Sequence, residues 1–359
     1  MSPEVWTVGV GLPGLAARQA ERAEAAGFDG ILMVDSQNLA GDPYVALTVA
    51  AGATERLRLG TGVTNPVTRH PAVTAASIAS VQGESGGRAV LGIGRGDSAL
   101  AHLGRAPASV DDFERYLTDL QTYLRGEPVT FDDAAATLTN AAPPVDTLRL
   151  ASGPDDSRMQ WLSMAGPKVP VDVAASGPRV LAVAARRADR VTFAVGADLE
   201  RVMWARAVVL AARADAGLDA DGISLGAYVN VVAHSDRDTA RELASGGLAS
   251  FARFSVMHGR PTGPVDDSMR DVLTNVHASY DMTGHTRAGA AQTVALTPEF
   301  ADRFAILGPP GECVARLRAL LEVGLERLVV IGPSIGADRQ ESAAAQRRFT
   351  EDVLPALRD

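Results

Sequence analysis

The chain has 359 residues, of which 46% are hydrophobic and 21% are charged, and its formal net charge is −9 at neutral pH. This composition is typical of a globular enzyme, and the negative charge argues against nucleic acid or an anionic membrane as the main partner. The single cysteine, Cys313, cannot form a disulfide within the chain, which favours a reducing compartment. The N-terminal residues lack the basic and apolar regions of a signal peptide and no apolar run reaches membrane-spanning length, so we expect a cytoplasmic protein.

Short apolar runs alternate with longer runs of helical periodicity along most of the chain. The short runs predict eight strands, at residues 7–12, 30–34, 57–63, 89–93, 171–175, 190–194, 225–232 and 327–331. The longer runs predict helices at residues 15–26, 42–53, 72–82, 110–124, 178–187 and 199–216. Strands that are apolar along their whole length favour a parallel sheet covered on both faces. Eight such βα repeats are the number that closes a TIM barrel, so we expect an α/β fold of the (β/α)8 class.

Two long intervals interrupt this alternation. Residues 130–170 are rich in proline, aspartate and threonine, and residues 254–306 contain patches dense in glycine and proline. Loops of this length inside a compact domain usually form lids or insertions. The sequence therefore predicts one barrel domain over residues 1–359, with insertions near 130–170 and 254–306 that lie at the C-terminal face of the strands, over the site.

The first βα unit contains a pattern that resembles a dinucleotide-binding fingerprint. Gly9, Gly11 and Gly14 have the required spacing, and Asp35 follows about 20 residues later, where such proteins bind a ribose. Pro13, however, removes a backbone N–H from the helix start that would have to bind pyrophosphate. Glycine-rich strand ends also recur at residues 59–66 and 91–97, which favours a barrel, so an NAD-dependent Rossmann dehydrogenase remains a distant alternative.

Two further motifs have ordinary structural interpretations. The G-x-S-x-G pattern around Ser334 matches a hydrolase nucleophile turn, but no histidine follows it in the chain, so we interpret it as a turn after a strand. The six histidines show no metal-binding spacing, and no metal site is predicted. His70, seven residues after a predicted strand, is as well explained by a helix-start histidine bonded to the local backbone as by a role in the site.

The segment that ends the fifth predicted strand is a candidate phosphate site. Ser176 is a candidate helix N-cap, and Gly177 and Pro178 open the next helix, where proline is tolerated in the first turn. Free N–H groups and the helix dipole would stabilise a phosphate at this position.

Residues 59–81 (LGTGVTNPVTRHPAVTAASIASV) and 87–104 (GRAVLGIGRGDSALAHLG) resemble the luciferase-like superfamily of flavin and deazaflavin oxidoreductases. The resemblance points to the methylenetetrahydromethanopterin reductase-like branch, which uses coenzyme F420, and it extends over nearly the whole chain except the two long intervals. It implies a (β/α)8 barrel, as in bacterial luciferase, whose cofactor lies at the C-terminal ends of the strands.

The resemblance also implies the cofactor-binding residues. The first group lies beside the ring and includes a position where many relatives have a cis peptide bond, between Gly62 and Val63. The second group flanks the cofactor after the fourth strand, and the third binds its phosphate. The group beside the ring is Asp35, Ser36, Gly62, Val63, Thr64 and Asn65. The group after the fourth strand is Gly94, Gly96, Asp97 and Ser98. The phosphate-binding group is Ala175, Ser176, Gly177 and Pro178.

The sequence departs from the family pattern at two places. Ser36 occupies a position where histidine is common, so a ring contact or proton donor is absent. The first strand end, VGVGLP, lacks the acid that methanopterin reductases share, which argues against methylenetetrahydromethanopterin as the substrate.

We therefore expect an oxidoreductase that transfers a hydride between coenzyme F420 and a small organic substrate. The acid–base candidates are Asp35, Asp97 and His70, while His285 and Arg287 in the second interval are candidate substrate contacts. Two alternatives remain, an FMN-dependent monooxygenase that activates oxygen and a non-catalytic protein that binds flavin or F420. The resemblance further suggests a homodimer or a higher homo-oligomer.

Overall fold

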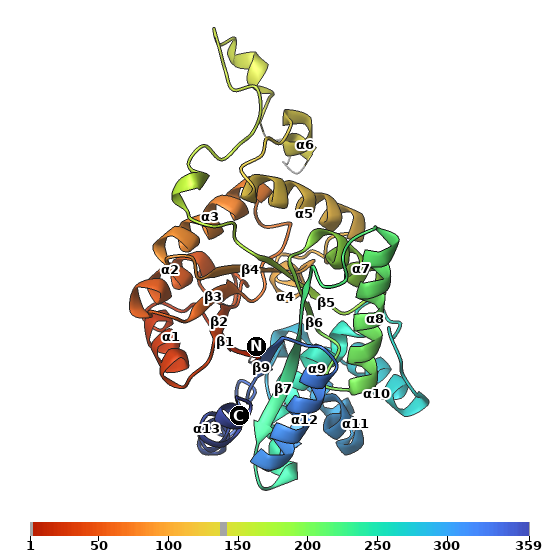
Figure 1. Cartoon of the computed structure of the whole chain (residues 1–359). Helices are drawn as coiled ribbons and strands as arrows, with labels where there is room; N and C mark the ends of the chain where they lie inside the picture. Colours follow the sequence, from red (N-terminus) through yellow and green to blue (C-terminus); the bar gives the residue numbers. More distant parts are fainter. Residues whose placement is uncertain (1–2, 137–141, 359) are drawn as a thin grey trace.

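Eight parallel strands form a closed barrel in the computed structural model, which describes residues 3–136 and 142–358 (Figure 1). Around the barrel the strands follow the order β6, β5, β4, β3, β2, β1, β9 and β7, and pairing of β6 with β7 closes the ring. Their bounds are β1 Glu4–Gly9, β2 Gly30–Met33, β3 Arg58–Thr61, β4 Ala89–Ile93, β5 Val171–Ala175, β6 Arg190–Phe193, β7 Ser224–Ala233 and β9 Arg327–Ile331. The predicted TIM barrel is confirmed.

All eight predicted strands are present, although β1 begins and ends three residues earlier than predicted. A ninth strand, β8 (Ile306–Gly308), was not predicted. It pairs only with the last residues of β7, beyond the point where β7 pairs with β9, so it lies outside the barrel ring. Three residues are too few to give a strand pattern in the sequence, and only the neighbouring β7 makes this segment extended.

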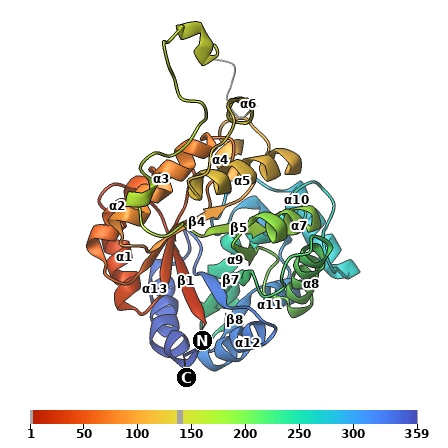
Figure 2. The same cartoon turned by 45° about the horizontal axis from the view of Figure 1, so that its top comes forward.

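Helices surround the barrel (Figures 1 and 2). They are α1 Ala16–Ala25, α2 Pro43–Ala53, α3 Pro71–Glu84, α4 Ser98–Ala101, α5 Val110–Leu124, α6 Phe131–Ala136, α7 Pro178–Arg187, α8 Leu199–Asp215, α9 Arg237–Phe254, α10 Asp267–Ala278, α11 Pro298–Phe304, α12 Pro310–Glu322, α13 Arg339–Arg348 and α14 Leu354–Ala356. The six predicted helices are confirmed. Aspartates begin several of them, since Asp42 and Asp198 each accept two backbone N–H groups of the first turn. Within the described residues, no helix is both long and apolar enough to cross a membrane.

Side chains fill the barrel interior near the N-terminal ends of the strands. A polar layer lies at the N-terminal ends of the strands, where the buried guanidinium of Arg327 lies 3.0 Å from Asp172 Oδ2 and donates to Thr192 Oγ1 over 2.9 Å. Above it, Trp6 is 1% exposed and packs in the same apolar cluster as Leu32. With this end of the barrel closed, open space for a ligand remains only towards the C-terminal strand ends.

The two insertions occupy different places. The second lies between α9 and β8, and its residues line a cavity at the C-terminal strand ends, as predicted. The first connects α5 to β5, and none of its described residues lines that cavity. Figures 1 and 2 show it extending outward beyond α3 and α5. The described part of this insertion leads from α5 away from the barrel and back to the start of β5, so the cover that we expected over the site is absent here.

The packing around Trp6 gives a test of the fold. A Cβ atom added at Gly30 would overlap the buried Trp6 ring, so we expect Gly30→Ala to lower the free energy of unfolding by about 2–3 kcal/mol. Urea denaturation followed by fluorescence measures this loss. Gly311→Ala is the matched control, because its Cβ meets nothing within 4 Å, and within α12 it should leave stability unchanged or raise it by up to about 1 kcal/mol. Equal stability of the two variants would contradict the proposed packing.

Candidate functional site

A cavity of about 690 Å³ lies at the C-terminal ends of the barrel strands. This volume is in the range of small-molecule and cofactor sites. Strand ends form its floor, and α9 and the second insertion form one wall. Tyr228, Phe251 and Phe254 place three aromatic rings along that wall, with ring centroids 5.6 Å apart for the first pair and 5.4 Å apart for the second. The cavity is therefore largely apolar, with a limited number of polar groups that could fix a ligand.

The structure brings most of the predicted site residues together. Those that line the cavity are Asp35, Ser36, Gly62, Val63, Asn65, Gly94, Gly96, Asp97, Ser98, Ala175, Ser176 and Gly177. Thr64 and Pro178 are next to lining residues in the chain but are not part of the lining themselves. Since these residues come from four separate strand ends, the barrel closure alone gathers them at one place.

His70 does not reach the cavity. It is the N-cap of α3, and its Nδ1 accepts the backbone N–H of Ala72 over 3.2 Å. This fixes the proton on Nε2, which donates to the carbonyl oxygen of Ala134 over 2.9 Å. The ring therefore holds α3 and the segment after α5 together, and the prediction of an acid–base role for His70 is corrected to a structural one.

Asp35 lines the cavity, but its carboxylate already has a partner. Its Oδ2 lies 2.5 Å from Nη1 of Arg69, whose other terminal nitrogen lies 2.9 Å from Asp42. Although burial opposes the charged guanidinium, the Asp35 carboxylate raises the pKa of Arg69. This arrangement indicates that Asp35 fixes the loop after β3 beside the cavity. The neighbouring Ser36 places its hydroxyl oxygen 3.5 Å from that of Ser98, across the cavity floor.

The loop after β3 presents one buried donor to the cavity. The peptide bond between Gly62 and Val63 is cis, as the family resemblance led us to expect. Asn65 is 1% exposed, and its Oδ1 accepts the backbone N–H groups of Val67 and Thr68. Its Nδ2 group is buried without a hydrogen-bond partner in the described part of the chain. A buried donor of this kind is costly unless a ligand accepts from it.

Asp97 forms an ion pair that the sequence did not reveal. Its Oδ1 binds Nη1 of Arg253, and both side chains are 14% exposed. Its Oδ2 is buried and has no hydrogen-bond partner among the described residues. Arg253 also lies over the ring of Tyr280, 4.7 Å from the ring centroid. Arg253 is on α9, immediately before the interval marked as an insertion, and only the mixture of arginine, histidine and aromatic residues over 251–260 could have drawn attention to it.

The start of α7 offers free backbone donors to the cavity. The N-cap is Gly177, so the prediction that Ser176 caps the helix is wrong, and no side chain of the described residues caps it. Ser176 instead donates its hydroxyl to the carbonyl oxygen of Phe254 over 2.9 Å, which ties this loop to α9. The first N–H groups of α7 are left for a ligand, and a helix N-terminus favours an anion.

Positive charge gathers beside this helix start. Arg95, His258 and Arg260 line the cavity, and Nη2 of Arg95 donates to Nε2 of His258 over 3.2 Å. Burial lowers the pKa of Arg95, and the charge of nearby Arg179 lowers it further. An anion bound at the start of α7 would offset the positive charge of Arg95.

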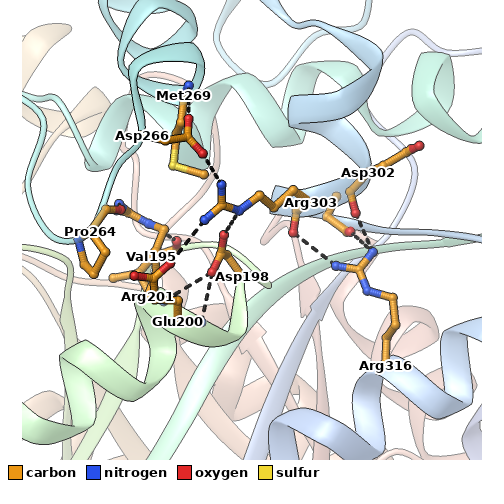
Figure 3. Close-up of polar contacts among 11 residues, drawn as sticks. Val195, Asp198, Glu200, Arg201, Pro264, Asp266, Met269, Asp302, Arg303 and Arg316 are labelled. Carbon is orange, nitrogen blue, oxygen red and sulfur yellow. Dashed lines mark hydrogen bonds and ion pairs between the residues drawn. The ribbon is translucent and has the colours of Figure 1, made fainter.

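Two arginines, the buried Arg201 and the partly exposed Arg303, hold the second insertion on the barrel (Figure 3). Arg201 of α8 is fully buried and donates to the carbonyl oxygens of Val195 and Pro264 over 2.9 and 2.8 Å, and to Ser255 Oγ over 2.8 Å. Burial lowers its pKa to about 10. Arg303 binds the carboxylates of Asp198 and Asp266, which joins α8, α10 and α11. These contacts fix the insertion that forms the cavity wall.

The remaining candidate residues divide between the cavity and the periphery. His285 lines the cavity, whereas Arg287 is exposed and pairs its backbone with Ile335. Ser334 Oγ accepts the N–H of Gly247 over 3.0 Å, in a turn after β9, as predicted. Cys313 is buried in α12, and burial raises the pKa of its thiol to about 11. The described residues contain no cluster of three or more histidine, cysteine or acidic side chains suited to a metal ion.

Comparison with known proteins gives consistent similarities. The model of the luciferase-like monooxygenase family matches residues 12–327. A 5,10-methylenetetrahydromethanopterin reductase of Methanolobus tindarius is 28% identical over 333 residues, which cover 91% of this chain and 92% of that protein. An F420-dependent glucose-6-phosphate dehydrogenase of Beutenbergia cavernae is 28% identical over 355 residues, covering 94% and 91%. The structure of the coenzyme F420-dependent tetrahydromethanopterin reductase of Methanopyrus kandleri superposes with a TM-score of 0.71 at 22% identity and covers 99% of both chains.

Proposed function

Because the chain belongs to the luciferase-like monooxygenase family, we propose that it is an oxidoreductase that transfers a hydride between coenzyme F420 and a small organic substrate. The names of the relatives support F420 as the cofactor, since proteins similar over nearly their full length include a methanopterin reductase and an F420-dependent dehydrogenase. When bound, the coenzyme supplies a deazaflavin ring that gives and accepts hydride and reacts little with oxygen.

The observation that carries the proposal is a pair of buried, unpartnered polar atoms in an otherwise largely apolar cavity. Asn65 offers an N–H donor at Nδ2, and Asp97 offers an acceptor at Oδ2. A heteroaromatic ring edge with both donors and acceptors would satisfy them. At another part of the cavity the uncapped start of α7 and the nearby guanidinium of Arg95 suit a phosphate. The residues present therefore fit a long, partly aromatic and anionic cofactor.

The chain's own contribution to the reaction is binding, orientation and exclusion of water. The strand-end loops would hold the ring against the cavity floor near Gly62 and Val63. The aromatic wall of Tyr228, Phe251 and Phe254 would then border the space left for the substrate. Positioning of this kind can account for a large share of the rate enhancement in hydride transfer. The absence of an acid at the C-terminal end of β1, in the segment VGVGLP, favours a substrate other than methylenetetrahydromethanopterin.

Titration of the purified protein tests the cofactor assignment. We expect F420 to bind with a Kd below about 100 μM, followed by the change in its fluorescence, and FMN and NADPH to bind more weakly. Tighter binding of FMN, together with oxygen consumption that depends on a substrate, would favour a monooxygenase. Tight F420 binding without turnover of any tested acceptor would favour a non-catalytic binding protein. Failure of both F420 and FMN to bind would contradict the proposal.

The phosphate site is tested by Gly177→Asp. A carboxylate there would cap α7 and repel a phosphate, so we expect the Kd of F420 to rise at least about tenfold, or about 1.4 kcal/mol, while the fold remains stable. Gly177→Ala is the control, because its Cβ meets no atom within 4 Å, and its affinity should stay within about twofold. Unchanged affinity in the aspartate variant would place the phosphate elsewhere.

We also propose that a second copy of the chain covers the face formed by α2, the start of α3 and the segment before α2. Val45 of α2, Val73 of α3 and Leu39 of the segment before α2 are 66%, 52% and 48% exposed, and α2 packs beside α3. The α2 sequence, PYVALTVAAGA, has no charged residue. An uncharged face can meet an identical face without the like-charge repulsion expected of a chain with a net charge of −9.

Sedimentation of the full chain tests this assembly. We expect the mass of two or more chains at micromolar concentration, and Val45→Asp should shift the mass to that of one chain because it buries a charge at the contact. Val294→Asp, at a position that is 87% exposed in the second insertion, should leave the mass unchanged. A monomeric unsubstituted chain would disprove the proposal.

A further inference from the structure

The cavity continues through a gap in the barrel wall. Pairing of β1 with β9 ends at Trp6 and Val329, although β1 extends to Gly9 and β9 to Ile331. On their other edges both strands stay paired over these last residues, β1 with β2 as far as Gly9 and β9 with β7 as far as Ile331. The two strands therefore separate next to the cavity, and their pairing closes the barrel ring only towards the N-terminal ends.

The lining of the cavity shows that the space passes through this gap. Val8 and Ile331 line the cavity from inside the barrel, since both pack against the cluster that contains Trp6. Val330, which also lines the cavity, belongs instead to the large apolar cluster between the strands and the surrounding helices. Thr7 lies between two residues whose side chains face inward, so its own side chain faces outward, and it lines the cavity as well. The cavity therefore reaches the outer surface of β1 and β9.

Helix α13, which lies next to α1 on this side of the barrel (Figures 1 and 2), leaves the space over that surface unfilled. Its sequence, RQESAAAQRR, contains no apolar side chain larger than alanine, whereas a helix on a barrel usually presents a stripe of large apolar residues to the strands. Ala345 is buried and lines the cavity together with the neighbouring Gln346. We call this part of the cavity the side pocket, and its residues are Thr7, Phe28, Val330, Ala345, Gln346 and Phe349.

Two aromatic rings mark how far the side pocket extends. Phe28 lies two residues before β2, near the level at which the strands begin. Its ring stacks on that of Phe349, with centroids 6.0 Å apart and an angle of 11° between the planes. Phe349 begins a π-helical turn that runs to Val353, and such turns are frequent at functional sites. Since Val10, just beyond the end of β1, also lines the cavity, the open space runs lengthwise along β1.

The chemistry of the side pocket differs from that of the rest of the cavity. Its six residues include no charged side chain, and the polar ones among them, Thr7 and Gln346, are neutral. The charged lining residues Arg95 and Asp97 follow β4, on another side of the barrel. An anionic group in the side pocket would lose its hydration without gaining a partner, whereas every CH2 group that leaves water there strengthens binding.

We propose that the side pocket binds an unbranched apolar hydrocarbon chain that belongs to the substrate, with the reacting end of the substrate over the strand ends. The proposal rests on the proposed function. The gap lies between two strands that have only just separated, which favours a thin hydrocarbon chain over a ring system. The cofactor is not the occupant, because its anionic group fits the start of α7 and the side pocket offers no positive charge. The hydrocarbon chain therefore enters as part of a second molecule beside the cofactor.

Binding of inert probes tests the side pocket without any cofactor. N-pentyl-, N-hexyl-, N-heptyl- and N-octylacetamide are uncharged and differ only in the length of the hydrocarbon chain, and calorimetric titration gives their Kd values. We expect the Kd to fall about three- to fourfold for each added CH2 group, because each one is removed from water. N-cyclooctylacetamide has the same number of carbon atoms and is the matched control, and its Kd should exceed that of N-octylacetamide by at least about tenfold. Affinity that does not depend on chain length, or equal affinity for the cyclic compound, would overturn the proposal.

Substitutions on α13 locate the bound hydrocarbon chain. Ala345→Leu extends a side chain into the side pocket, so the Kd of N-octylacetamide should rise at least about tenfold, and the Tm should hold or rise because the space is filled. Ala343→Leu, at an exposed position of the same helix, is the matched control and should leave the Kd within about twofold. If Ala345→Leu does not fold, Gln346→Trp replaces it, because Gln346 is exposed and its substitution should weaken binding as much. Unchanged affinity in a folded pocket variant would contradict the proposed location.

The two proposals fail in different ways. At saturating F420, N-octylacetamide should bind with a Kd within about twofold of its value for the free protein, since the two ligands occupy different parts of the cavity. Mutual exclusion would show that the hydrocarbon chain takes the place of the cofactor, which overturns the side-pocket proposal and leaves the proposed function standing. If F420 does not bind, the proposed function is wrong, and with it the assignment of the hydrocarbon chain to the substrate.

Discussion

The position of the site depends on how the inside of the barrel is filled. Trp6 and the ion pair of Arg327 with Asp172 occupy the lower half, and Gly30 exists at its position because any larger residue would overlap the Trp6 ring. The cavity lies where the strands end, which is the face at which barrels of this class carry their sites. The residues that we assign to cofactor binding lie at the C-terminal strand ends, because Trp6 and the Arg327–Asp172 ion pair already fill the interior towards the N-terminal ends.

Within the cavity, two regions differ in chemistry. The start of α7, with Arg95 and Arg260 in the cavity lining, offers backbone donors and positive charge, which suits an anionic group. The region around Asp97 and His285 contains the ion pair of Asp97 with Arg253 and an imidazole in contact with the Tyr280 hydroxyl. Both regions belong to the same cavity, and the aromatic wall contributes to its largely apolar surface. This division is what a cofactor with a phosphate at one end and a reactive ring at the other requires.

The second insertion links the fold to the chemistry. It brings His285 to the cavity, and its own position depends on Arg201, whose three hydrogen bonds reach the loop after β6 and two points of the insertion. Arg303 adds ion pairs to Asp198 and Asp266 (Figure 3). This wall is costly to move, because displacing the buried Arg201 would leave backbone carbonyl groups without partners and displacing Arg303 would expose the buried Asp198 carboxylate to the same loss. The imidazole is thus supplied by a loop yet placed with the rigidity of the barrel.

The sequence by itself determined the barrel, its eight strands, most helices and the segments that line the cavity. Apolar runs and glycine-rich strand ends are local signals, and parallel strands must bring their C-terminal ends to one face. It could not decide which side chains at that face are free. His70 and Asp35 were both acid–base candidates, but one caps a helix and the other is bound to Arg69. Only the tertiary structure paired Asp97 with Arg253 and His285 with Tyr280, because contacts between distant segments leave no periodic pattern in the sequence. The protonation of a side chain depends in turn on the partners that its polar atoms meet in the fold.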